Sequence, residues 1–111
     1  MSAPVDNQIT LWLPEQGLVT HQALGKLAEE LGEAAQIAAR CIIQGLDASD
    51  PKAGVPNREA LAKELADIHA ASFFLAEVAG LRIDAGRVAS KQAGFHRWAD
   101  MLLEHLEASN V

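Results

Sequence analysis

The fold of this chain is decided by residues 21–45, HQALGKLAEELGEAAQIAARCIIQG. Apolar side chains recur within this stretch every three or four residues: Leu24, Leu27, Leu31, Ala35, Ala38 and Ile42. That spacing is typical of one face of an α-helix. Thr20 precedes the stretch as the expected N-cap, and Gly45 ends it as the expected C-cap. The sequence therefore predicts a long amphipathic helix over residues 21–44.

Two further helices are expected toward the C-terminus. The first spans residues 58–79, with Asn57 as its N-cap and Gly80 as its stop signal. The second runs over about residues 85–107 and follows Asp84, a favourable cap. The apolar positions of this last helix are Val88, Phe95, Trp98, Leu102 and Leu106.

The remaining segments carry no helical pattern. Residues 46–56 are rich in Asp, Gly and Pro and are expected to form a loop. In the N-terminal segment 1–19, the apolar patch at residues 11–13 could form one turn of helix. The chain has no alternating run rich in Val or Ile, so no strands are expected. The prediction is a single all-α domain over residues 1–111.

The helix expected at residues 58–79 is apolar on almost all sides. One side carries Leu61, Leu65, Ile68 and Leu75, and most of the rest carries Ala66, Ala70, Phe73, Phe74 and Val78. A helix that is apolar all round must be buried all round, and 111 residues offer little material to bury it. We therefore expect this helix to lie in an interface between identical chains, in a homodimer or a homotetramer.

Composition restricts the class of protein. Half of the residues are apolar, which argues against a disordered chain, and no apolar run approaches the roughly 20 residues that cross a membrane. The formal net charge of −6 argues against a nucleic-acid partner. The single cysteine, Cys41, allows no disulfide within the chain, and the first residues lack an export signal. We expect a cytoplasmic protein without a membrane or nucleic-acid partner.

Five acidic residues lie where an ordinary solvated surface does not account for them. Glu29, Glu30 and Glu33 share one side of the first helix, and Glu64 and Asp67 are neighbours on the second. Carboxylates that converge among apolar side chains repel one another and lose hydration, which protonation or divalent cations can relieve. Oxygen ligands without cysteine suit Mg²⁺, with Mn²⁺ as a substitute. A solvated helix face with Lys26 and Lys63 as ion-pair partners is the alternative interpretation.

Gly32 lies inside the first helix, where glycine costs about 1 kcal/mol relative to alanine. Close approach of another helix or of a ligand beside the carboxylates would explain its presence.

The residues Glu29-Glu30-Leu31-Gly32-Glu33 resemble the EExxE element of the MazG-like all-α nucleoside triphosphate pyrophosphohydrolases, and residues 64–67, ELAD, resemble its partner element ExxD. The resemblance covers about residues 20–98. It implies a helical bundle that dimerises and cleaves nucleoside triphosphates between the α- and β-phosphates with Mg²⁺. It also implies that Glu30, Glu33, Glu64 and Asp67 are the metal ligands, with Glu29 as an extra ligand or general base.

The resemblance extends to candidate substrate contacts. Lys91 and Arg97 could meet phosphate oxygens or could be ordinary surface residues, and Trp12 could stack on a base or lie in the core. Many relatives have an asparagine four residues after the lysine, where this chain has Phe95. The 30 residues between Glu33 and Glu64 also make a long connection. Both departures leave the nucleobase preference open.

The leading hypothesis is an Mg²⁺-dependent pyrophosphohydrolase of NTPs or dNTPs that removes unwanted nucleotides. A related enzyme that acts on a phosphoribosyl-nucleotide, as phosphoribosyl-ATP pyrophosphohydrolases do, is the nearest alternative. A non-catalytic helical module that binds metal or nucleotide and a simple helical dimerisation domain are the alternatives from other classes.

Overall fold

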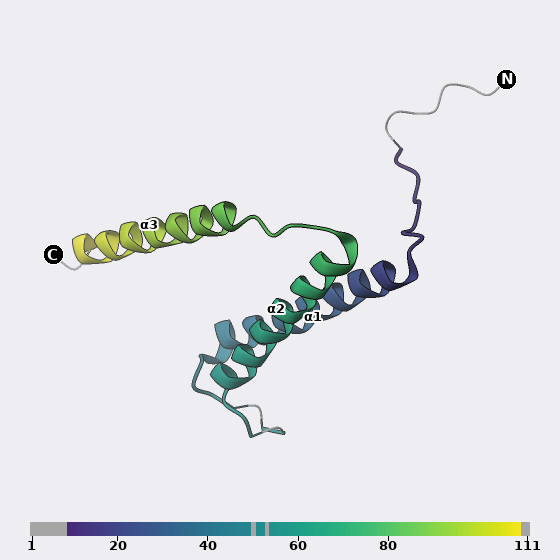
Figure 1. Cartoon of the computed structure of the whole chain (residues 1–111). Helices are drawn as coiled ribbons and strands as arrows, with labels where there is room; N and C mark the ends of the chain where they lie inside the picture. Colours follow the sequence, from purple (N-terminus) through teal and green to yellow (C-terminus); the bar gives the residue numbers. More distant parts are fainter. Residues whose placement is uncertain (1–8, 50, 53, 110–111) are drawn as a thin grey trace. The chain divides into compact units, whose positions relative to one another are not determined.

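The computed structural model describes residues 9–49, 51–52 and 54–109. They form three helices, α1 (Leu18–Gln44), α2 (Asn57–Ala79) and α3 (Ala85–Ser109), as Figure 1 shows. The described residues contain no strand, only an isolated bridge between Ser49 and Pro56. The predicted all-α class is confirmed. The chain divides into two compact units, Met1–Leu81 with α1 and α2, and Arg82–Val111 with α3.

Helix α1 begins earlier than predicted. Gly17 is its N-cap, and the amide of His21 donates to the Gly17 carbonyl at 2.8 Å. This bond spans Thr20, so the prediction that Thr20 caps the helix is wrong. Residues 9–17 are not helical, so the expected turn at residues 11–13 is also absent. The end of α1 is as predicted, because Gly45 has a φ of 88°, which other residues rarely adopt.

Asn57 is the first residue of α2 and does not cap it through its side chain. Its Nδ2 donates to Gln44 Oε1 at 3.3 Å and to the Gly45 carbonyl at 3.0 Å, while its Oδ1 accepts from Arg40 Nε at 2.9 Å. The predicted cap is thus a fully buried polar link between the end of α1 and the start of α2.

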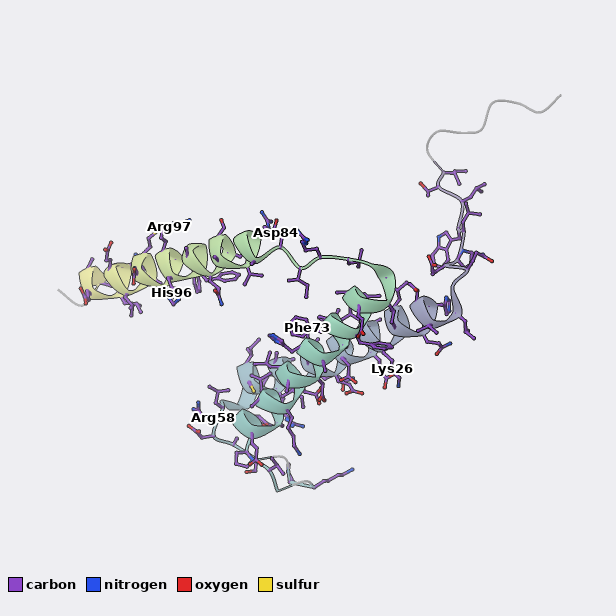
Figure 2. All side chains as sticks on the ribbon, in the orientation of Figure 1. Lys26, Arg58, Phe73, Asp84, His96 and Arg97 are labelled. Atoms are coloured by element: carbon purple, nitrogen blue, oxygen red, sulfur yellow. The ribbon has the colours of Figure 1, made fainter. Side chains whose placement is uncertain are left out.

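The other helix ends follow the sequence signals. Gly80 ends α2 in the left-handed conformation, and the Leu81 amide donates to the Ala76 carbonyl, as in a Schellman-type cap. Asp84 Oδ1 accepts from the Arg87 amide at 3.0 Å at the start of α3 (Figure 2). Both predictions are confirmed.

Helices α1 and α2 pack as an antiparallel hairpin. The side of α1 that meets α2 carries Ala23, Leu27, Glu30, Ala34, Ile37 and Cys41, none of which is fully exposed. The predicted buried face of α1 is therefore displaced by about one residue, since Leu24, Leu31 and Ile42 are 45%, 49% and 86% exposed. Alanines at the contact let the two helix backbones approach closely, which leucines in their place would prevent.

Few apolar side chains of the described residues are buried: Ala23, Ala34 and Leu75. On α2, Leu65, Phe73 and Phe74 are exposed, so the chain does not by itself cover this helix on all sides (Figure 2). No described residue of α3 is buried. None of the described helices is long and apolar enough to cross a membrane.

Candidate metal centre

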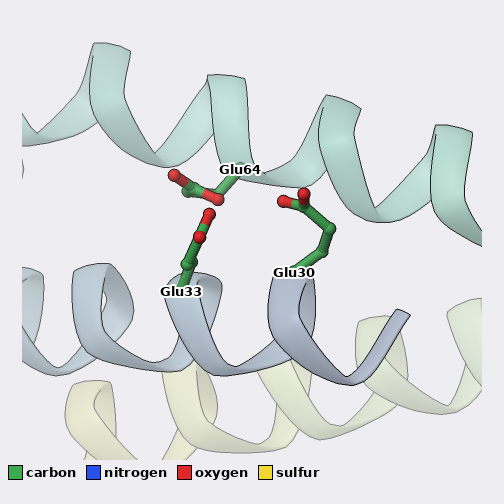
Figure 3. A group of neighbouring side chains, drawn as sticks. All are labelled: Glu30, Glu33 and Glu64. Carbon is green, nitrogen blue, oxygen red and sulfur yellow. The ribbon is translucent and has the colours of Figure 1, made fainter. Parts of the chain in front are cut away.

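Three glutamates from two helices converge near the middle of the α1–α2 hairpin. Glu30 and Glu33 are three residues apart on α1 and project toward Glu64 on α2 (Figure 3). One carboxylate oxygen from each residue lies within 4.8 Å of those of the other two. The antiparallel packing brings these residues to the same level, just as it brings Arg40 to Asn57 nearer the loop.

Two of these side chains are partly withdrawn from water. Glu30 and Glu64 are half-buried and Glu33 is exposed. The Oε2 atoms of Glu30 and Glu64 are shielded from solvent, and neither accepts a hydrogen bond from any described residue. Shielded carboxylate oxygens without a hydrogen-bond donor are uncommon, because the lost hydration is not replaced.

Crowding changes the acidity of this group. The pKa of Glu30 is raised, first by burial and then by the negative charges of Glu33, Asp67, Glu64 and Glu29. The pKa of Glu64 is raised by burial, by the charges of Glu33 and Asp67, and by a hydrogen bond with Glu33. A bound cation would reverse the cause of both shifts, since it replaces the lost hydration and cancels the repulsion.

The other two acidic residues stand at the edge of the group. Asp67 is exposed and lies outside the group of three, but its charge raises the pKa of Glu30 and Glu64. Glu29 is exposed, and its Oε2 lies 3.3 Å from Lys26 Nζ. The ion pair that the alternative interpretation expects therefore forms at Glu29, while the structure brings Glu30, Glu33 and Glu64 together.

Gly32 does not have the predicted packing role within the described residues. A Cβ atom added to it would meet nothing within 4 Å, so no helix approaches it closely.

An open hollow lies along the N-terminal part of α1. Trp12, which is 94% exposed, lines it with Leu13, Pro14, Glu15, His21, Leu24 and Gly25, around about 590 Å³. A smaller hollow of about 300 Å³ shares His21 and Gly25 and extends to Lys26 and Glu29. The exposure of Trp12 does not fit a core residue. His21 and Gly25 were not expected here, although their spacing of four residues places them on one side of α1.

Lys91 and Arg97 both lie on α3, in the second unit. They line a hollow of about 640 Å³ together with Ser90, Gly94, Phe95 and Trp98. Lys91 Nζ lies 5.4 Å from the centre of the Phe95 ring, a distance suited to a cation–π contact. Phe95 thus holds the lysine by its ring, where many of the proteins that the sequence resembles have an amide.

No protein-family model matches the chain, and no curated protein or solved structure is detectably similar to it. The resemblance to the pyrophosphohydrolases rests on the two acidic patterns and the residues around them.

Proposed function

We propose that this protein is an Mg²⁺-dependent hydrolase that converts an NTP or dNTP to the nucleoside monophosphate and pyrophosphate. The observation that supports the proposal is the convergence of Glu30, Glu33 and Glu64 from two helices. The EExxE and ExxD patterns that contain these residues resemble those of MazG-like pyrophosphohydrolases, and that resemblance suggests the substrate class. The proposed role is the removal of unwanted nucleotides from the cellular pool.

The donor set fits a hard divalent cation. It consists of carboxylate oxygens, of which two are shielded from water and have no hydrogen-bond donor. Glu30, Glu33 and Glu64 would hold the cation, with Asp67 as the fourth ligand. When bound, Mg²⁺, or Mn²⁺ in its place, would neutralise phosphate charge and make water more acidic.

Other residues of the chain have proposed roles around this centre. Glu29, one residue before the ligand Glu30, is the proposed base that accepts a proton from the attacking water. Lys26 holds the Glu29 carboxylate from one turn away. Trp12 is the proposed stacking surface for the base, since its exposed ring lines a hollow that reaches toward Glu29 through His21 and Gly25. Lys91 and Arg97 are proposed to contact phosphate oxygens that the cation does not neutralise.

We also propose that the active form is a homodimer or homotetramer. With three buried apolar side chains among its described residues, a single copy has too small a core for an independent helical bundle.

The reaction is tested by measuring pyrophosphate release with Mg²⁺ from standard and damaged NTPs and dNTPs and from a phosphoribosyl-nucleotide. We expect activity on one or more of these substrates, and a loss of at least about 100-fold in kcat/KM in Glu33→Gln, because loss of a charged ligand removes stabilisation of the transition state. Glu59→Gln, an exposed glutamate in the first turn of α2, is the matched control and should retain full activity.

The outcomes distinguish the candidate functions. Turnover of only the phosphoribosyl-nucleotide would indicate the dedicated enzyme. Metal-dependent nucleotide binding without pyrophosphate release would contradict the catalytic proposal and favour a binding module.

A further inference from the structure

The α1–α2 hairpin has two faces of very different charge. We place residues on each helix at about 100° per residue, starting from the side that contacts the other helix. On α1, the charged residues Lys26, Glu29, Glu30, Glu33 and Arg40 then fall within an arc of about 100° that includes this contact side and the metal centre. Leu24, Leu31 and Ile42 fall on the opposite flank, within about 20° of one another.

Helix α2 repeats this arrangement. Lys63, Glu64 and Asp67 lie toward the contact with α1 or on the same side as the metal centre. Leu65 and Ser72 lie on the opposite flank and carry no charge. Because the helices are antiparallel and the acids lie on the same rotational side of both, the two uncharged flanks form one continuous face of the hairpin. We call it the uncharged face and define it by Leu24, Leu31, Ile42, Leu65 and Ser72.

The uncharged face is exposed in a single copy. Leu24, Leu31, Ile42 and Leu65 are between 45% and 86% exposed. Between Leu24 and Ile42 the face is about 27 Å long and, across two helices, about 20 Å wide. The footprint is thus about 540 Å² before side-chain relief is added, which approaches the roughly 800 Å² of accessible surface that each partner buries in a stable interface.

Charge identifies the partner that this face fits. Two copies of a chain with a net charge of −6 repel each other over most of their surfaces, and two metal-centre faces would repel most strongly. The uncharged face is a surface on which a second copy can approach without bringing like charges together. Twofold pairing also places the same apolar residues from both copies opposite one another.

We propose that the uncharged face of the α1–α2 hairpin is the interface with a second copy of this chain. The two hairpins form a four-helix core that buries Leu24, Leu31, Ile42 and Leu65 of both copies. The two acidic groups then lie on opposite outer sides of this core. This proposal does not depend on the proposed reaction, since it rests on the distribution of charge and exposure alone.

Sedimentation of the full chain, with circular dichroism in parallel, tests the proposal through a matched pair of isoleucines. Ile42 and Ile43 are adjacent and similarly exposed, at 86% and 82%, but Ile43 points away from the uncharged face. We expect the wild type to sediment at twice its 11.8 kDa chain mass or at a higher even multiple. Ile42→Glu should raise the dimer dissociation constant at least about 10-fold, while Ile43→Glu leaves it unchanged.

Leu31→Lys provides a second, more central probe of the same face. We expect this variant to be monomeric, whether it stays helical or unfolds, because a side chain that is half-exposed in one copy is tolerated unless a second copy covers it. A helical wild-type monomer would overturn the proposal and indicate that another occupant covers the face. A Leu31→Lys variant that remains a stable dimer, or equal effects of Ile42→Glu and Ile43→Glu, would also overturn it.

Discussion

At the scale of single residues, the chemistry of this protein depends on how Glu30 and Glu64 tolerate their positions. Each carries an oxygen shielded from water, and each has a pKa above the ordinary value of 4.5. The folded chain therefore holds these carboxylates in an environment that favours protonation when no cation is present. Their position is costly to the metal-free protein and becomes favourable only when a cation binds.

This cost predicts an unusual pH dependence. A carboxyl group with a raised native pKa binds more protons in the folded than in the unfolded state, so the free energy of unfolding falls as pH rises from about 4.5 through the raised native pKa. In urea denaturation with a chelator present, we expect Glu64→Gln to gain stability relative to wild type as pH rises above about 5. A stability difference that is independent of pH would show that Glu64 is not destabilised by ionisation.

At the scale of helices and loops, Asn57 is the residue that joins α1 to α2. It is fully buried, and its side chain contacts Arg40, Gln44 and the Gly45 carbonyl. Nearby, Arg58 forms an exposed ion pair with Asp47 at 3.3 Å. The structure thus places a buried and an exposed polar link side by side at the same end of the hairpin.

We expect Asn57→Ala to destabilise the protein by about 1–3 kcal/mol, because it leaves buried donors and acceptors without partners. Arg58→Ala should cost less than about 1 kcal/mol, because exposed ion pairs contribute little. Urea denaturation of both variants at one protein concentration measures the difference. Equal costs for the two substitutions would contradict the role assigned to Asn57.

The elements also show what the sequence can and cannot predict. The helix ends at Gly45 and Gly80 and the cap at Asp84 were predictable, since these signals depend on local backbone conformation alone. The start of α1 and the role of Asn57 were not, because both depend on hydrogen bonds that compete with the side-chain cap. For α1, Ala23 and Ala34 contact α2 while Leu24 stays exposed, and a choice between two apolar flanks requires knowledge of the neighbouring helix.

The candidate site follows the same rule. Helical spacing alone predicted that Glu30 and Glu33 would share a side, and the acidic pattern at residues 64–67 predicted partners on the second helix. The pattern could not predict that Asp67 lies at the edge of the group, since this depends on how α2 is rotated against α1. Nor could it predict that His21 and Gly25 line a hollow with Trp12.

At the scale of the whole molecule, the chain's acidity is unevenly placed. The acidic group on one side of the α1–α2 hairpin contains five of its fifteen Asp and Glu residues, Glu29, Glu30, Glu33, Glu64 and Asp67, while the uncharged face contains none. This separation allows one face to bind cations and the other to bind a second copy. The proposed metal centre and the proposed dimer are thus two consequences of one distribution of charge, but each can fail without the other.

The most direct test of the proposed metal centre is a calorimetric titration of Mn²⁺ and Mg²⁺ into the full chain, with Glu64→Gln and Glu59→Gln in parallel. We predict saturable binding by the wild type and by Glu59→Gln, and affinity at least about 10-fold weaker in Glu64→Gln, because that substitution removes a charged oxygen ligand. Absence of saturable binding by the wild type, or equal affinity in all three proteins, would contradict a metal centre at Glu30, Glu33 and Glu64.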